Sequence, residues 1–189
     1  MRITGGIARG IPLAVPKGNA VRPATDGMRQ AVFSSLGARV ANAWFLDLFA
    51  GSGAYGLEAL SRGATGGVFV EQNARAVVCV RRNIAAVCKS LGRDPRGLTV
   101  SQEDARTVPT GGGGVPDLVF IDPPYEIIPE IAGPLFARLA VELAAKPGAI
   151  VVLELPGGLD VAPPGWTLLK RLGKGARQPT VAFFQKARV

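Results

Sequence analysis

Histidine is absent from this chain of 189 residues, and cysteine occurs only at Cys79 and Cys88. The missing histidine excludes Ser-His triads, Cys-His nucleophiles and histidine-ligated metals. Because both cysteines fall within one predicted helix, neither a disulfide framework nor a C-x-x-C zinc or redox pair is expected. Any chemistry must therefore use carboxylates, tyrosine, backbone groups or a cofactor, and we expect no bound metal.

Long apolar runs are missing as well. No stretch reaches the roughly 18 to 20 uninterrupted apolar residues of a membrane span, and the first ten residues lack the apolar core of a signal peptide. We therefore expect a cytoplasmic protein with no membrane partner. Hydrophobic residues make up 48% of the chain, which is enough for one buried core. We predict a single domain over residues 1–189 and a monomer.

Acidic residues are scarce at both ends of the chain, whose formal net charge is +8. Residues 1–39 contain six lysines and arginines against Asp26 alone, and residues 166–189 contain six against none. Clustered lysine and arginine favour a phosphate-bearing partner, because they displace counterions from nucleic acid. Solvated surface charge in a basic proteome is the alternative explanation.

The order of predicted elements indicates an α/β fold. Residues 1–23, rich in glycine, proline and basic residues, are expected to form a basic N-terminal arm or hairpin. After them, short apolar strands alternate with helices, which is typical of a mostly parallel, doubly wound sheet. Two closing strands without a helix between them predict an antiparallel hairpin and seven strands in all. The strands are expected at 44–49, 67–71, 98–100, 117–122, 149–153, 166–172 and 180–185, and the helices at about 27–39, 55–62, 74–91 and 129–145.

A glycine-rich loop follows the first predicted strand, in the run Asp47-Leu-Phe-Ala-Gly-Ser-Gly-Ala-Tyr-Gly56. Its glycines permit a tight turn and a close approach of backbone N–H groups to a ligand. Glu71 ends the next strand, where a carboxylate can bind a ribose diol. The pattern fits a dinucleotide or S-adenosylmethionine equally well. The candidate cofactor residues of the two segments are Asp47, Phe49, Gly51, Ser52, Gly53 and Glu71.

Asp47 distinguishes the two ligands. A carboxylate just before the glycine loop would repel a pyrophosphate but can bind the amino group of a methionine moiety, which favours S-adenosylmethionine over NAD. Asp104 and Ala105, just past the third strand, are predicted to contact the adenine. A helix cap explains Asp104 equally well from its spacing.

Asp122-Pro123-Pro124-Tyr125 ends the fourth strand, across the expected switch point from the glycine loop. Two consecutive prolines lack N–H donors and restrict the backbone, so this segment forms a stiff platform with free carbonyl groups. A planar group bearing an NH₂ could donate to Asp122 and to the Pro123 carbonyl while Tyr125 stacks on its ring. We predict that these four residues are catalytic, and that they aim the amine lone pair at a sulfonium methyl.

These motifs resemble the amino-methyltransferases of the class I Rossmann-like fold. More closely, the chain resembles the RsmD family, bacterial methyltransferases of guanine N2 in small-subunit ribosomal RNA. The match rests on Arg29, Phe33 and residues 1–6, 21–26, 46–54, 56–64, 69–71 and 120–125. The chain departs from the usual family residues at Ala24, Gly27, Ser34 and Tyr55.

The resemblance implies methylation of the exocyclic N2 amine of a guanine in 16S ribosomal RNA, with S-adenosylmethionine as cofactor. Ribosomal RNA or an assembling small ribosomal subunit would be the partner. It also implies that Thr25 lies near the methionine moiety and Arg22 near RNA phosphate. We predict that Arg2, Arg9 and Arg29 contact the RNA together with Arg22.

Four other functions stay open at this point. An adenine-N6 DNA methyltransferase can use the same Asp-Pro-Pro-Tyr but usually needs a target-recognition insertion. A protein-glutamine methyltransferase usually has asparagine at position 122. An NAD-dependent oxidoreductase would leave Asp47 and the two prolines unexplained. A non-catalytic RNA-binding assembly factor would explain the charge and nothing at residues 122–125.

Overall fold

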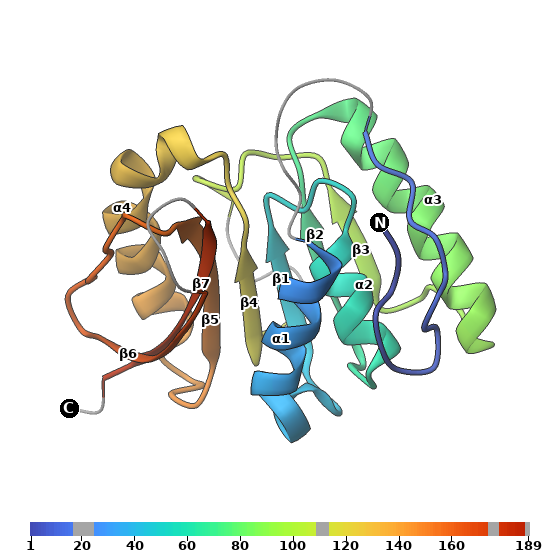
Figure 1. Cartoon of the computed structure of the whole chain (residues 1–189), viewed down its shortest axis with the longest axis horizontal. Helices are drawn as coiled ribbons and strands as arrows, with labels where there is room; N and C mark the ends of the chain where they lie inside the picture. The colour runs from blue at the N-terminus through green and yellow to red at the C-terminus, as the bar shows by residue number, and fades with distance from the viewer. Residues whose placement is uncertain (17–24, 109–113, 174–177, 188–189) are drawn as a thin grey trace.

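The computed structural model describes residues 1–16, 25–108, 114–173 and 178–187, which contain one seven-stranded sheet (Figure 1). The strand order is β3-β2-β1-β4-β5-β7-β6. The first five strands along the chain pair in parallel, whereas β7 is antiparallel to both β5 and β6. This confirms the predicted sheet and its antiparallel hairpin. The bounds are β1 Trp44–Leu48, β2 Gly66–Val70, β3 Leu98–Ser101, β4 Leu118–Ile121, β5 Ile150–Pro156, β6 Trp166–Leu172 and β7 Pro179–Lys186.

The helices begin and end at residues that favour a helix terminus. Thr25 and Asn73 cap their helices, because each side chain accepts a hydrogen bond from a backbone N–H of the first turn. Gly92 ends α3 in the left-handed conformation. The helical elements are α1 Asp26–Leu36, η1 Gly37–Val40, α2 Ala54–Ser61, α3 Ala74–Leu91, η2 Tyr125–Ile127 and α4 Ile128–Glu142. Among the described residues, no helix is long and apolar enough to span a bilayer.

The sheet is covered on both faces. Alternate residues of each strand point to opposite faces, so Phe45 packs in the cluster that includes residues of α1, α2 and α3, whereas Leu46 packs in the cluster that includes α4. Ala105 and Val108, from the connection between β3 and β4, join the α4 cluster. Because β1 lies between β2 and β4, the strand order reverses at its carboxyl end, where ligands bind in such sheets.

The first residues of the chain form a small hairpin against α2. Arg2 and Pro12 form an antiparallel bridge, and Ile3, Ala8 and Leu13 are buried. The backbone N–H of Ala8 donates to the Ser61 hydroxyl at 2.9 Å, so the hairpin is hydrogen-bonded to the end of α2. The hairpin thus contributes Ile3, Ala8 and Leu13 to the core on the α1–α2–α3 face.

A buried carboxylate fixes the junction between hairpin, α1 and α2. Glu58 has no exposed surface and accepts hydrogen bonds from the backbone and the hydroxyl of Thr4, at 2.8 and 2.7 Å. It also pairs with Arg62 at 2.8 Å, and its Oε2 lies 3.9 Å from Nε of the buried Arg29. A buried charge is tolerated only when it is paired and hydrogen-bonded in this way.

Glu58→Ala should destabilise the protein by about 3 to 5 kcal/mol, because it leaves the buried Arg29 without this anionic neighbour. The free energy of unfolding from urea titration measures the loss. Asp94→Ala, which removes the half-exposed partner of Arg96, is the control and should change stability little. A loss for Glu58→Ala as small as that of the control would contradict the structural role given to this carboxylate.

Candidate active site

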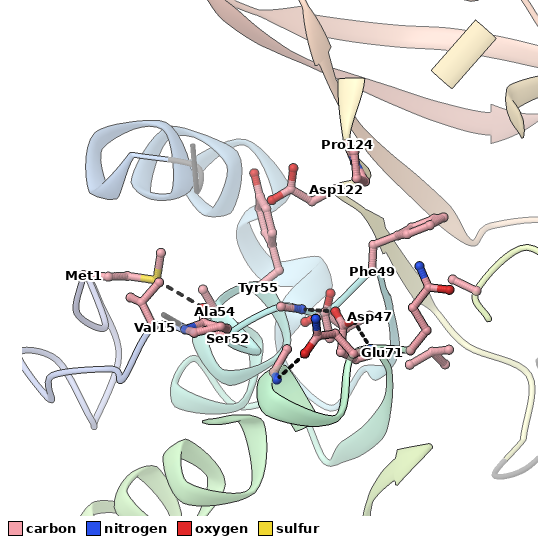
Figure 2. A pocket seen from close by; sticks show the side chains of 18 of the residues that line it. Met1, Val15, Asp47, Phe49, Ser52, Ala54, Tyr55, Glu71, Asp122 and Pro124 are labelled. Atoms are coloured by element: carbon pink, nitrogen blue, oxygen red, sulfur yellow. Dashed lines mark hydrogen bonds between the residues drawn. The ribbon is translucent and has the colours of Figure 1, made fainter. Parts of the chain in front are cut away.

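A cavity of about 320 Å³ lies at the carboxyl ends of β1, β2 and β4 (Figure 2). Its volume falls at the lower end of the roughly 300 to 1,000 Å³ of small-molecule sites. Three walls come from the loops after these strands, and a fourth comes from the N-terminal hairpin. The lining includes Met1, Val15, Pro16, Arg29, Asp47, Phe49, Ala50, Gly51, Ser52, Tyr55, Val70, Glu71, Gln72, Asn73, Ala105, Asp122 and Pro124.

The loop between β1 and α2 adopts a strained, left-handed course. Phe49, Gly51 and Gly53 have φ of +59°, +55° and +77°, a region that favours glycine. A Cβ at Gly51 would meet no atom nearer than the Phe49 carbonyl oxygen at 3.9 Å, so the space beside this glycine is open, as a ligand site requires. A Cβ at Gly56 would lie 2.4 Å from the Phe69 ring, so this glycine permits α2 to pack closely on the sheet.

Asp47 lies at the base of the cavity. The carboxylate is 1% exposed, and its Oδ2 accepts a hydrogen bond from the Gly56 backbone N–H at 2.9 Å. Burial raises the pKa of Asp47 to about 8, and the nearby Glu71 charge adds to the rise, against the opposing effect of the Gly56 hydrogen bond. A carboxyl group in this state is ready to ionise when a positively charged ligand group enters.

Glu71 follows β2 and lies at the second wall. Its Oε2 accepts from the Gly51 backbone N–H at 2.9 Å, and its Oε1 accepts from the Asn73 backbone N–H at 2.8 Å. These two bonds orient the carboxylate toward the cavity that it lines. Each carboxylate oxygen can accept more than one hydrogen bond, so Glu71 keeps capacity for a hydroxyl-bearing ligand.

Two of the four predicted catalytic residues, Asp122 and Pro124, form the third wall, whereas Pro123 and Tyr125 are not among the lining residues. Asp122 and Pro124 line the cavity, and Pro123 is buried. Burial raises the pKa of Asp122 well above its ordinary range, and the neighbouring Glu154 raises it further. Tyr125 begins η2, and its hydroxyl donates to Glu154 at 3.1 Å. The glycine loop and the first part of the Asp-Pro-Pro-Tyr segment, far apart in sequence, thus line one cavity through Asp122 and Pro124.

Three predicted cofactor residues do not line this cavity. Gly53 lies at the start of α2, behind the lining residues of its loop. Thr25 is exposed and caps α1, with its hydroxyl 3.1 Å from the Met28 backbone nitrogen. Asp104 pairs with Arg106 at 2.7 Å, and hydrogen bonds from Arg106 lower the pKa of Asp104. Its neighbour Ala105 does line the cavity, as predicted.

The predicted RNA-contacting arginines have different environments. Arg2 and Arg9 are exposed on the hairpin, and Arg22 lies outside the described residues. The prediction that Arg29 contacts RNA stays a prediction: this side chain has no exposed area, and it lines the cavity. Its guanidinium donates to the Arg2 carbonyl at 2.6 Å and to Asp26 at 2.7 Å. Arg29 is therefore a buried cation at the acidic cavity wall.

Sequence reasoning missed several residues that shape this site. Asn83 of α3 is buried and bonds to both backbone groups of Ala14 and to the Ser52 carbonyl, at 2.8 to 2.9 Å. It thereby joins the hairpin to the glycine loop. Glu154 is buried in β5 beside the platform. Both could have been suspected, because Asn83 interrupts the apolar stripe of its helix and Glu154 interrupts an apolar strand.

Asp47→Asn should reduce the pH dependence of stability. In the folded protein the carboxyl group of Asp47 stays protonated up to a pH of about 8, whereas in the unfolded chain it loses its proton near pH 3.8. Ionisation of Asp47 therefore lowers the free energy of unfolding progressively as pH rises through that interval. Asparagine can still accept the Gly56 hydrogen bond without ionising. In urea titrations between pH 4 and pH 9, the free energy of unfolding of the variant should rise relative to that of the parent as pH rises. A difference between the two proteins that is the same at every pH would contradict the raised pKa.

Comparison with known proteins gives consistent matches over the chain. A family model described as Conserved hypothetical protein 95 matches residues 1–184. The protein named Ribosomal RNA small subunit methyltransferase D of Escherichia coli (strain K12) is 32% identical over 188 residues, which cover 98% of this chain and 90% of that protein. The structure of yhhF from Escherichia coli has a TM-score of 0.74 and 30% identity, covering 99% of this chain and 98% of that one.

A more distant structure shares the fold. It is an RNA methyltransferase from Salinibacter ruber in complex with S-adenosyl-L-homocysteine, with a TM-score of 0.63 and 16% identity over 88% of this chain and 95% of that one. The family match and the full-length relative agree with the resemblance carried by the motifs of residues 1–125. This chain belongs to the family of Conserved hypothetical protein 95, the RsmD family.

Proposed function

We propose that this protein transfers a methyl group from S-adenosylmethionine to the exocyclic N2 amine of a guanine in small-subunit ribosomal RNA. One observation carries the proposal: two walls of the cavity bear the carboxylates of Asp47 and Glu71, and the third bears Asp122 and Pro124. A cofactor site and an amine-binding platform are thereby adjacent. The names of the full-length relatives, which are small-subunit ribosomal RNA methyltransferases, support RNA as the substrate.

The cavity residues fit S-adenosylmethionine. Glu71 suits a ribose diol, because its oxygens retain lone pairs beyond the two backbone bonds they accept. Asp47 suits the ammonium of the methionine moiety, since a cation would offset the cost of ionising a buried carboxyl. Phe49 and Ala105 offer apolar surface to the adenine. The bound S-adenosylhomocysteine of the Salinibacter ruber neighbour supports this assignment. When bound, S-adenosylmethionine supplies an electrophilic sulfonium methyl.

The platform residues hold the attacking amine. Asp122 and the Pro123 carbonyl each accept a hydrogen from the NH₂ group, which orients its lone pair and prevents rotation. Methyl transfer requires in-line approach, so positioning of this kind can account for a large share of the rate. Tyr125 stacks on the base, which must leave its helical stack to reach the cavity.

The alternatives fit the cavity less well. Asp47, buried at the foot of the glycine loop, offers no positive charge to the pyrophosphate of NAD, and such an anion would oppose the ionisation of its carboxyl group. A non-catalytic RNA-binding factor would not need two carboxylates with raised pKa, Asp47 and Asp122, at one cavity. An adenine-N6 activity could use the same platform, and the nucleoside product of the reaction distinguishes it from guanine-N2 methylation.

Asp122→Ala should lower the turnover of methyl transfer by about 100-fold or more, because the amine loses an acceptor that positions it. Affinity for S-adenosylhomocysteine, measured by calorimetry, should stay within about twofold, since Glu71 and Asp47 are unchanged. Asp94→Ala, at the opposite edge of the sheet, is the matched control. Turnover undiminished in Asp122→Ala would exclude the proposed role of the platform.

The substrate is identified by transfer of tritiated methyl to small ribosomal subunits and to their extracted RNA, both from cells lacking this protein. The expected product of nucleoside analysis is N2-methylguanosine. Label in N6-methyladenosine, or no label on any RNA although the cofactor binds, would reject guanine N2 as the acceptor. Titration with NADH is expected to show no binding.

A further inference from the structure

Glu154 is a buried carboxylate directly beside Asp122. Ile121 of β4 pairs with Leu153 of β5 in parallel register, so the next residues along the two strands are neighbours. The alternation of side chains places both carboxylates on the face of Phe120, toward α1 and α2. Glu154 is 1% exposed. A buried acid and a partly exposed acid of the cavity wall therefore lie side by side.

Both oxygens of the Glu154 carboxylate accept hydrogen bonds from tyrosines. The Tyr55 hydroxyl donates to Oε2 and the Tyr125 hydroxyl donates to Oε1, each at 3.1 Å. Tyr55 lies in the first turn of α2, directly after the glycine loop, whereas Tyr125 ends the platform. Glu154 thus connects the segment assigned to the cofactor with the segment assigned to the base.

Tyr55 is held rigidly. Its ring stacks on Phe120, with centroids 5.4 Å apart and planes 17° apart, and it contacts Phe33 at 6.4 Å. The residue is 5% exposed. Figure 2 shows its side chain rising beside Asp122 at the cavity wall. A ring fixed in this way can aim its hydroxyl at Glu154 with little loss of side-chain entropy.

We infer that Glu154 and Tyr55 are positioning residues, which hold Tyr125 for the target base and control the charge carried by Asp122. This inference rests on the proposed methyl transfer. Glu154 acts through its two neighbours: its Oε1 anchors the Tyr125 hydroxyl, and its charge acts on the carboxyl group of Asp122. Tyr55 keeps the Glu154 carboxylate in the orientation in which it can act on both Tyr125 and Asp122.

Charged groups from three other elements act on Asp122. Burial is the largest cause of its raised pKa, followed by Glu154 of β5 and Asp47 of β1, and only Arg29 of α1 opposes them. Since the ionised carboxylate of Asp122 is the form proposed to accept an amine hydrogen, activity should rise with pH through its pKa. Removal of the Glu154 charge should lower that pKa and extend activity to lower pH.

The Glu154 carboxyl itself is balanced by its neighbours. Burial raises the pKa of Glu154, whereas the hydrogen bonds from Tyr55 and Tyr125 and the charge of Arg29 lower it. Loss of either hydroxyl should therefore favour the protonated, neutral form of Glu154. The two tyrosines are needed for Glu154 to act as an anion beside the platform.

Three conservative variants test the inference. Tyr125→Phe keeps the ring and removes its anchor, so KM for the RNA should rise about tenfold. Tyr55→Phe and Glu154→Gln should also raise KM for the RNA, because each weakens the contact that holds the Tyr125 hydroxyl. Affinity for S-adenosylhomocysteine should stay within about twofold in all three. If Glu154→Gln does not fold, the two tyrosine variants still decide the question.

The pH profile separates this role from simple structural support. In Glu154→Gln, the acid limb of kcat against pH should shift to lower pH. A merely structural loss would reduce kcat at every pH without a shift. Asp94→Asn, which removes a carboxylate at the opposite edge of the sheet, should leave the limb unmoved. Unchanged KM and an unshifted limb in all three variants would overturn the inference.

A second readout does not depend on activity. In the free protein, carbon NMR of labelled aspartate carboxyl groups follows the pKa of Asp122, which should be lower in Glu154→Gln than in the parent. An unchanged Asp122 pKa would overturn the electrostatic part of the inference even if the parent methylated no RNA. Absence of methyl transfer by the parent would instead count against the proposed function.

Discussion

The parallel register of β1, β4 and β5 is the constraint on which the site depends. Leu48 pairs with Ile121 and Ile121 with Leu153, so the residues that follow each strand meet at one edge of the sheet. Side chains of one parity share a face, which brings Asp47, Asp122 and Glu154 to the same side. A slip of one residue in any of these pairings would turn a carboxylate into the α4 cluster.

Gathering three acids in a buried place has an electrostatic cost, and the fold offsets it with Arg29. This arginine lies at the cavity wall and lowers the pKa of both Asp122 and Glu154. It is held there by Asp26, by the Arg2 carbonyl and by its proximity to Glu58. The N-terminal hairpin is consequently part of the site, because it helps to fix the cation that the acids require.

Many features of the fold and part of the site followed from local sequence. Strand and helix positions agreed within a few residues, because short apolar runs, capping residues such as Asn73 and the stop at Gly92 are local signals. The acids at strand ends, Asp47 and Glu71, could be found from the motif around the glycine loop. In each case the physical cause lies within a few neighbouring residues.

Only the tertiary structure decided the burial of charge. Arg29 was predicted to contact RNA, and the structure shows that this side chain is buried, because α1 packs against α2 and the hairpin. Tyr55 and Glu154 are distant in sequence, and nothing local predicts the bond between them. The sequence by itself determined the fold class, the glycine loop and the Asp-Pro-Pro-Tyr platform. Strand register and helix packing decided which charged groups meet, because these depend on contacts between segments far apart in the chain.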